Sequence, residues 1–366
     1  MRKLLYKILL AVNIAAGTSL ILSYLSVHIN PAVFALPAFF GLAYPYILLV
    51  NIILAIIWAV RLRPEALISL VLIVVGFPHF RNYLKMGKQG EDKTGTFKLL
   101  SYNVRLFNQF EGKGTAGSEN LILDFLRNQN PDILCLQEFY ISGNPRQKEQ
   151  YFARALGGKY HSHLKVLGSG RNRYYGIATF SRFPVAEKGD VIHPESSSLS
   201  IYTDVIIEKD TFRIFNNHLQ SFRLKRVERS FLNELTGSSA EREAITEIRS
   251  LYSSLRSGFA LRATQARLLK DNIDSSPHPV IVTGDFNDTP VSYSYRRIRK
   301  GLNDSFVKSG SGAGFTYRGN YPPNRIDYIL YDNALESRSF DIIRIKHSDH
   351  YPVIAYLRKR LEGKVP

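Results

Sequence analysis

The sequence predicts an α/β sandwich, in which two mixed β-sheets pack face to face with helices outside, preceded by transmembrane helices. From residue 97 to residue 362, short apolar and β-branched runs alternate with segments that have the apolar spacing of helices. The first 85 residues are mostly apolar and contain one acidic residue, Glu65, while residues 86–96 are polar and contain glycine. We therefore expect a membrane anchor (1–85), a linker (86–96) and a four-layered α/β domain (97–362).

Three uncharged runs make up the expected anchor. Ile8 to Val27 is twenty residues long, which is enough to cross a bilayer as a helix. Pro31 to Val60 is thirty residues long, and because its prolines lie in the first half we expect a span over residues 40–60. Ala66 to Phe80 has only fifteen residues, so it is either a short third span or a re-entrant or interfacial segment. A cleaved signal peptide is the alternative for the first run, but a second long run follows it.

The side of the membrane on which the α/β domain lies depends on the third run. Basic residues flank the first two runs, and we expect them to stay cytoplasmic. They are Arg2, Lys3, Lys7, Arg61 and Arg63. If residues 66–80 cross the bilayer, the domain lies outside the cytoplasm; if they do not, it is cytoplasmic. We expect three spans, and therefore a multi-pass protein with its α/β domain on the non-cytoplasmic side.

Apolar runs rich in β-branched and aromatic residues predict the strands of the α/β domain. They are 97–104, 132–137, 174–181, 201–208, 212–219, 278–286, 325–331 and 350–357. Helical apolar spacing predicts helices at 119–130 and 148–156, and the segment 223–274 is helix-rich with interspersed charges. Strands and helices thus alternate along the chain, which is the pattern of an α/β sandwich.

The chain is basic, with 48 Lys and Arg against 31 Asp and Glu and a formal net charge of +17. Residues 1–90 hold eight of these basic residues and Glu65, so the rest of the chain has a net charge of +10. This balance fits a polyanionic partner such as nucleic acid or anionic lipid head groups. It fits a generally basic domain equally well, because no dense Lys/Arg run marks one groove. The single cysteine, Cys135, excludes an intramolecular disulfide and does not identify the compartment.

Polar residues that can bind metal or move protons lie in or just after five of the apolar runs. The motifs are SYNVRLFN from Ser101, DILCLQEFY from Asp132, VIVTGDFNDTP from Val280, NRIDYIL from Asn324 and HSDHYPVIA from His347. Their polar members are Asn103, Glu138, Asp285, Asn287, Asp327, Asp349 and His350. Each alone is a weak signal, since charged residues at strand ends are usually solvated. Together they have the layout of a metal-dependent hydrolase site.

In this order, from about residue 96 to residue 357, the motifs resemble the endonuclease/exonuclease/phosphatase superfamily. That superfamily includes DNase I-like nucleases, abasic-site endonucleases, neutral sphingomyelinases and inositol polyphosphate 5-phosphatases, and it shares the α/β sandwich fold. In abasic-site endonucleases an acid follows the first motif asparagine by two positions, whereas here the residue is Arg105. The chain therefore looks more like the DNase I and sphingomyelinase branch. The resemblance does not extend to the first ninety residues.

The resemblance implies a role for each motif residue. Glu138 is the expected metal ligand, joined by the neutral oxygen of Asn103 and by Asp349, and such oxygen ligands favour Mg²⁺ or Mn²⁺. His350 is the expected proton-transfer residue, with the carboxylate of Asp327 orienting its ring.

Five further residues are expected around this centre. Asp285 would orient the water or the leaving group, and Asn287 would donate a hydrogen bond to a phosphoryl oxygen. His218 in FNNHLQS would donate to the phosphate, as the second histidine of the family does. Tyr175 is expected to shape the pocket wall, or else to be a core aromatic residue. Arg325 is expected to contact the phosphate, or else to cover the edge of the sheet.

We therefore predict a membrane-anchored, Mg²⁺- or Mn²⁺-dependent phosphodiesterase of the nuclease type. A lipid phosphodiesterase of the sphingomyelinase type, or a phosphoinositide phosphatase, is the alternative, and the amphipathic pattern of residues 221–235 is consistent with membrane-surface contact. An inactive membrane scaffold is disfavoured because the whole motif set is retained. The expected partners are a phosphodiester substrate, either nucleic acid or a phospholipid head group, and the bilayer; no protein partner is evident. The motifs do not choose the substrate, because that choice lies in the loops.

Overall fold

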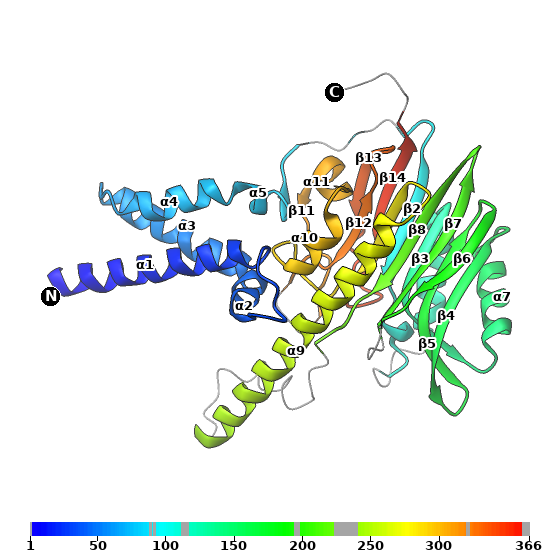
Figure 1. Ribbon diagram of the computed structural model, residues 1–366, viewed down its shortest axis with the longest axis horizontal. Helices are drawn as coiled ribbons and strands as arrows, with labels where there is room; N and C mark the ends of the chain where they lie inside the picture. The colour runs from blue at the N-terminus through cyan, green and yellow to red at the C-terminus, as the bar shows by residue number, and fades with distance from the viewer. Residues whose placement is uncertain are drawn as a thin grey trace. The chain divides into compact units, whose positions relative to one another are not determined.

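The chain divides into two compact units in its computed structural model, and each is described by itself (Figure 1). The structure describes residues 2–87, 90, 93–110, 117–193, 198–222, 241–319 and 323–360. The first unit takes in residues 1–83, 222–266 and 288–297, and the second takes in residues 84–221, 267–287 and 298–366. The expected anchor region therefore shares its unit with two segments that come from the expected α/β domain.

Two six-stranded sheets form the centre of the second unit, as the sequence predicts. One sheet has the order β10 (Asn303–Asp304), β12 (Asp327–Tyr331), β9 (Val280–Asp285), β8 (Asp210–His218), β7 (Leu199–Ile207) and β6 (Val185–Val191). The other has the order β13 (Leu335–Ile342), β14 (Val353–Lys359), β2 (Phe97–Asn103), β3 (Ile133–Ser142), β5 (Arg173–Ser181) and β4 (His161–Gly170). Each sheet is mixed, because it contains one parallel pair of strands. The parallel pair is β8 with β9 in the first sheet and β2 with β3 in the second, and all other neighbouring strands in the two sheets are antiparallel.

Alternating side chains of β2 build two layers of the core. Leu99 packs in one buried cluster with Ile281 of the opposite sheet, so this cluster joins the two sheets. The next residue, Leu100, points to the other face and packs in a second cluster with Leu126 of α6 (Ser118–Gln129) and Phe152 of α7 (Pro145–Ala155). The remaining elements of this unit are η1 (Arg105–Asn108), α11 (Ser305–Ser309) and a small sheet of β1 (Leu84–Lys85) with β11 (Gly312–Ala313).

The first unit is helical. It contains α1 (Arg2–Leu25), α2 (Leu36–Leu42), α3 (Tyr44–Val60), α4 (Ala66–Val75), α5 (Phe77–Phe80), most of α9 (Glu241–Asp274) and most of α10 (Tyr293–Arg299). Buried polar side chains join three of these helices. Ser69 Oγ of α4 donates to Asn13 Oδ1 of α1 at 2.7 Å, and Asn51 Nδ2 of α3 donates to the carbonyl oxygen of Ala16 at 3.0 Å.

The expectation of three continuous spans is corrected by the helix breaks. Among the described helices, only Lys3–Leu25 in α1 is long and apolar enough to cross a membrane by itself, and a signal sequence near the N-terminus has the same properties. The second expected span is bent by 72° between α2 and α3, where Pro45 lies in the first turn of α3. Residues 66–80 are broken at Gly76 into α4 and the short α5, which has a proline in its first turn.

Candidate active site

Strand register brings the predicted polar residues of both sheets together. In one sheet Asp285 of β9 pairs with Asp327 of β12 on one side and with His218 of β8 on the other. In the other sheet Asn103 ends β2, and Glu138 lies one residue beyond its pairing partner in β3. Asn103 Nδ2 donates to Asp285 Oδ2 at 3.0 Å and to Glu138 Oε1 at 3.2 Å. The polar strand ends of the two sheets therefore meet at this amide.

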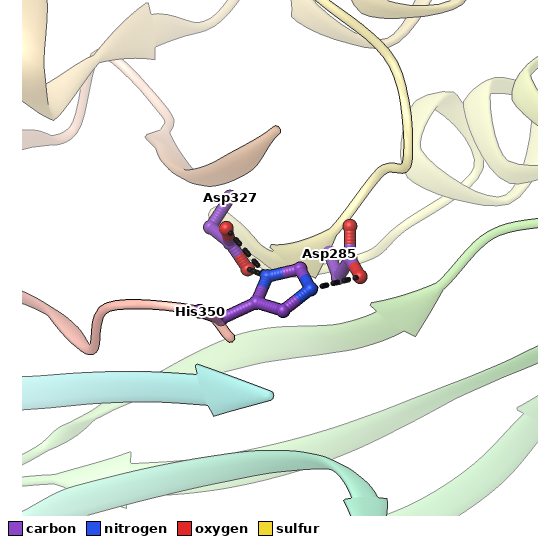
Figure 2. Close-up of side chains that lie close together, drawn as sticks. All are labelled: Asp285, Asp327 and His350. Carbon is purple, nitrogen blue, oxygen red and sulfur yellow. Dashed lines mark hydrogen bonds and ion pairs between the residues drawn. The ribbon is translucent and has the colours of Figure 1, made fainter. Parts of the chain in front are cut away.

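His350 lies between two buried carboxylates (Figure 2). Its Nδ1 is 3.0 Å from Asp327 Oδ2, and its Nε2 is 3.7 Å from Asp285 Oδ2. Burial by itself lowers the pKa of His350, but the charges of Asp327 and Asp285 and the hydrogen bond to Asp327 outweigh it and raise the pKa to about 10. At neutral pH the ring is therefore an imidazolium. Burial acts in the opposite sense on the acid, so that the pKa of Asp285 is raised.

Asp285 is fixed by the turn that follows β9. The backbone N–H of Asn287 donates to Asp285 Oδ1 at 2.8 Å, and Asn287 Nδ2 lies 3.3 Å from Asp285 Oδ2. The same Nδ2 donates to the carbonyl oxygen of Leu219, which follows β8, at 3.0 Å. Just before Asp285, Gly284 has a φ of +124°, and a Cβ there would lie 2.0 Å from the carbonyl oxygen of Asn217. Only glycine fits this close approach of two strands.

Glu138 reaches the centre from a bulge in β3. The register between β3 and β5 shifts between Leu136 and Phe139, and Glu138 has a φ of +52°. Its Oε1 lies 3.5 Å from His218 Nε2, which is itself 3.8 Å from Asp285 Oδ2. This buried ring nitrogen accepts or donates no hydrogen bond among the described residues.

The donor set suits a divalent cation. Asp285, Asp327 and His350 form a buried cluster whose ligand atoms lie within 4.8 Å of one another, consistent with a metal site. The two ring nitrogens of His350 face Asp327 and Asp285. The carboxylate oxygens of Glu138 and Asp285 are ligands of the kind that Mg²⁺ or Mn²⁺ accepts.

Asp349 and Asn103, the other two expected metal ligands, have protein partners here. Asp349 Oδ2 pairs with Arg105 Nε at 3.1 Å. Asn103 Oδ1 accepts from the backbone N–H of Arg105 at 2.9 Å, so the NH₂ group of this amide, and not its oxygen, faces Glu138. Their service as metal ligands stays a prediction, which requires these contacts to rearrange.

The two expected substrate-binding residues lie in other surroundings. Arg325 has no exposed surface; its Nη2 donates to Asp304 Oδ1 at 2.6 Å, and its guanidinium lies 4.5 Å from the centre of the Phe306 ring. The expected phosphate contact of Arg325 stays a prediction, which requires this enclosed guanidinium to become accessible. Tyr175 is half-buried in β5, opposite Tyr140 of β3.

Three contributors to the site escaped the sequence analysis. Tyr317 packs the edge of its ring against His350, with 5.2 Å between ring centres. Ser348 Oγ donates to the carbonyl oxygen of Asn103 at 2.8 Å and accepts from the backbone N–H of His350 at 3.2 Å, so it ties the His350 loop to β2. Arg105 was noted only as a departure from a motif. Ser348 and Arg105 had a signal in the sequence, since they lie inside the motifs HSDH and SYNVRLFN, whereas Tyr317 lies outside every motif.

Comparison with known proteins agrees with this geometry. A family model described as the endonuclease/exonuclease/phosphatase family matches residues 100–350, and a model described as a domain of unknown function matches residues 6–83. No curated protein matches the chain.

Solved structures of the same fold include an endonuclease/exonuclease/phosphatase from Beutenbergia cavernae, with 18% identity, 72% of each chain covered and a TM-score of 0.52. The human Nocturnin catalytic domain has 20% identity and a TM-score of 0.52, covering 73% of this chain and 94% of its own. A humanized D. rerio TDP2 has 15% identity and a TM-score of 0.52, covering 73% and 100%.

Proposed function

We propose that this chain, which belongs to the endonuclease/exonuclease/phosphatase family, hydrolyses phosphodiester bonds with the help of Mg²⁺ or Mn²⁺. The observation that carries the proposal is the ring of His350, held between Asp327 and Asp285 beside the carboxylate of Glu138. Hydrolysis of a phosphodiester needs positive charge at the phosphoryl group, an acceptor for the proton of water and a donor for the leaving oxygen.

The pKa shifts support an assignment of the proton donor and the proton acceptor to particular residues. Because its pKa is about 10, His350 begins the reaction protonated and donates a hydrogen bond or a proton. Asp285, whose pKa is raised by burial, is the better-matched acceptor for the proton of the attacking water. Asp327 holds the ring of His350 through Nδ1. His218 is left to donate to a phosphoryl oxygen.

A separate set of residues would bind the cation. Glu138 would hold it, with Asn103 and Asp349 as expected from the family, and it would supply the positive charge that neutralises the phosphate. Purified full-length protein in detergent should hydrolyse bis(p-nitrophenyl) phosphate, lose that activity in EDTA and regain it with Mg²⁺ or Mn²⁺. His350→Ala should remove most turnover, whereas His161→Ala, at the exposed start of β4, should not. Full activity after exhaustive EDTA treatment would overturn the proposal.

For the substrate we propose a nucleic acid first, because the net charge of +10 over residues 91–366 is compatible with a polyanion. A lipid phosphodiester is the second candidate, and the N-terminal helices favour it. A panel of DNA, RNA, sphingomyelin and phosphoinositides, each assayed with Mg²⁺, separates the two. Cleavage of lipids alone would replace the first candidate by the second.

We also propose that the N-terminal helices are embedded in a bilayer with more than one pass. The support is their inverted pattern: Asn13, Asn51 and Ser69 are fully buried, while large apolar side chains of α1, α3 and α4 are exposed. Examples of the exposed side chains are Leu5, Ile14, Leu49, Ile53, Leu67 and Val74. Reporters fused after Arg63 and after Pro366 test the topology. A cytoplasmic first reporter with a non-cytoplasmic second would show that the broken segment 66–80 crosses, and identical behaviour would show that it does not.

A further inference from the structure

The N-terminal helices make direct contacts with the chain segment that leaves the catalytic strand β9. Ser26 Oγ, in the loop after α1, lies 2.7 Å from the carbonyl oxygen of Val291 and 2.6 Å from that of Ser23, and its one proton is shared between these two acceptors. Thr289 Oγ1 donates to the carbonyl oxygen of Gly41 in α2 at 3.3 Å. A Cβ on Gly41 would lie 2.3 Å from the carbonyl oxygen of Val291 and 2.4 Å from Ser26 Oγ. The backbone of α2 therefore lies directly against residues 289–291, with no room for a side chain.

The segment 288–292 is buried along its length, although it is a connection between elements and carries polar residues. Its first residue, Asp288, pairs with Arg262 of α9, and the two side chains are 4% and 0% exposed. The distance from Arg262 Nε to Asp288 Oδ2 is 3.2 Å. Asp288 is joined by a peptide bond to Asn287, whose backbone N–H holds the carboxylate of Asp285. A shift of this segment is therefore transmitted to Asp285 through one residue.

The segment that leaves the other catalytic strand, β8, ends in the same cluster. Phe222, four residues after His218, lies under the guanidinium of Arg262, with 4.2 Å between the guanidinium carbon and the ring centre. Phe222 also packs edge-on against Phe259, at 5.3 Å between ring centres. From α2, Phe39 stacks on Tyr252 at 5.0 Å and meets Phe259 edge-on at 5.2 Å.

We infer that Ser26, Phe39 and Gly41 are positioning residues for catalysis, because they hold the two segments that continue from His218 and Asp285. The N-terminal region then contributes to the geometry of the catalytic residues, in addition to any role as a membrane anchor. This inference rests on the proposed function for its catalytic readout, and hydrogen exchange gives it a second readout that needs no substrate.

The test compares two glycine substitutions in full-length protein in detergent. Gly41→Ala places a methyl group against the carbonyl of Val291, while Gly17→Ala, in α1, meets side-chain ends, Leu72 Cδ1 at 3.0 Å and Ile68 Cγ2 at 3.5 Å. We expect Gly41→Ala to speed amide exchange over residues 285–292 and to lower kcat for bis(p-nitrophenyl) phosphate by roughly 10- to 100-fold, with little change in KM, because small displacements of reacting groups cost this much. Gly17→Ala should change neither quantity.

A second pair covers the case in which Gly41→Ala does not fold. Ser26→Ala deletes the hydroxyl contacts to the carbonyl oxygens of Val291 and Ser23 without adding atoms. Ser19→Ala is the matched control, because it deletes only a hydroxyl contact to a carbonyl oxygen within α1, that of Ala15. Ser26→Ala should again speed exchange over residues 285–292 and lower kcat, while Ser19→Ala should not. Unchanged exchange, or faster exchange with wild-type kcat, overturns the inference and leaves the proposed function standing. If the wild type hydrolyses nothing, the proposed function fails, and exchange alone decides whether the N-terminal region holds this segment.

Discussion

Replacing Asp327 by Asn should move the pH dependence of catalysis, because Asp327 is the strongest of the charges that keep His350 protonated. The pKa of about 10, against an ordinary value of 6.5, corresponds to roughly 5 kcal/mol in favour of the imidazolium. Asp327 contributes through its charge and through its hydrogen bond at 3.0 Å. Without that carboxylate we expect the pKa of His350 to fall by roughly 1–3 units, which is the usual effect of one close opposite charge.

The assay is kcat for bis(p-nitrophenyl) phosphate between pH 6 and pH 11, with the His350 ring titrated by NMR as a check that needs no turnover. In the wild type the alkaline loss of activity should follow deprotonation near pH 10. In Asp327→Asn this alkaline loss of kcat should begin at a lower pH, and its shift should equal the shift of the His350 pKa measured by NMR. The ratio of wild-type to variant kcat should therefore grow as the pH rises. Asp332→Asn, at the turn after β12, is the control. Coincident alkaline limbs in the wild type and Asp327→Asn would refute the reasoning.

Three other outcomes follow from the structure. Glu138→Ala should raise the Mg²⁺ concentration needed for half-maximal activity by about tenfold or more, as a metal titration of kcat would show, and excess Mg²⁺ should partly restore turnover. Gly284→Ala should lower both the melting temperature and kcat, since its Cβ would lie 2.0 Å from a backbone oxygen; an unchanged melting curve would contradict this. Burial lowers the pKa of His193 to about 4, so its folded form resists protonation, and stability should fall as the pH drops from 6.5 towards 4. His193→Gln should reduce that loss by roughly 2 kcal/mol between pH 6.5 and 4.5, measured by denaturant unfolding.

The central strands could be predicted from sequence because burial on both faces selects continuous apolar runs. β3 and β9 are of this kind, and both were expected. The edge strands β6 and β13 were missed, because an edge strand has one solvated side and its sequence is correspondingly polar. In β6, VAEKGDV, most side chains are exposed and carry no apolar alternation. The segment 223–240, expected to be helix-rich, lies outside the described residues.

Some residues of the site could be predicted from the sequence and others could not, depending on whether their role follows from local sequence. Residues at the ends of apolar runs, such as Asp285, are recognisable because the run fixes where the strand ends. The role of Arg325 could not be read from its position beside Asp327, since its partner Asp304 is distant in sequence and only the tertiary fold brings the two together. Likewise, nothing local indicates that Tyr317 reaches His350. Contacts between residues far apart in sequence carry no periodic signal.

The backbone around the site is held in conformations that cost free energy. Arg105 to Asn108, Glu138 and Asn287 all have φ near +50°, and each such residue costs on the order of 1 kcal/mol. The packing of Phe107, which is fully buried against Phe139, opposes this cost at η1. In return, the left-handed turn at Glu138 carries the carboxylate out of the regular alternation of β3, and the turn at Asn287 aims a backbone N–H at Asp285. A relaxed backbone at these positions would be more stable locally but would separate Asp285 from the groups that hold it, so the aromatic core behind η1 and β3 serves the geometry of the site as well as the stability of the fold.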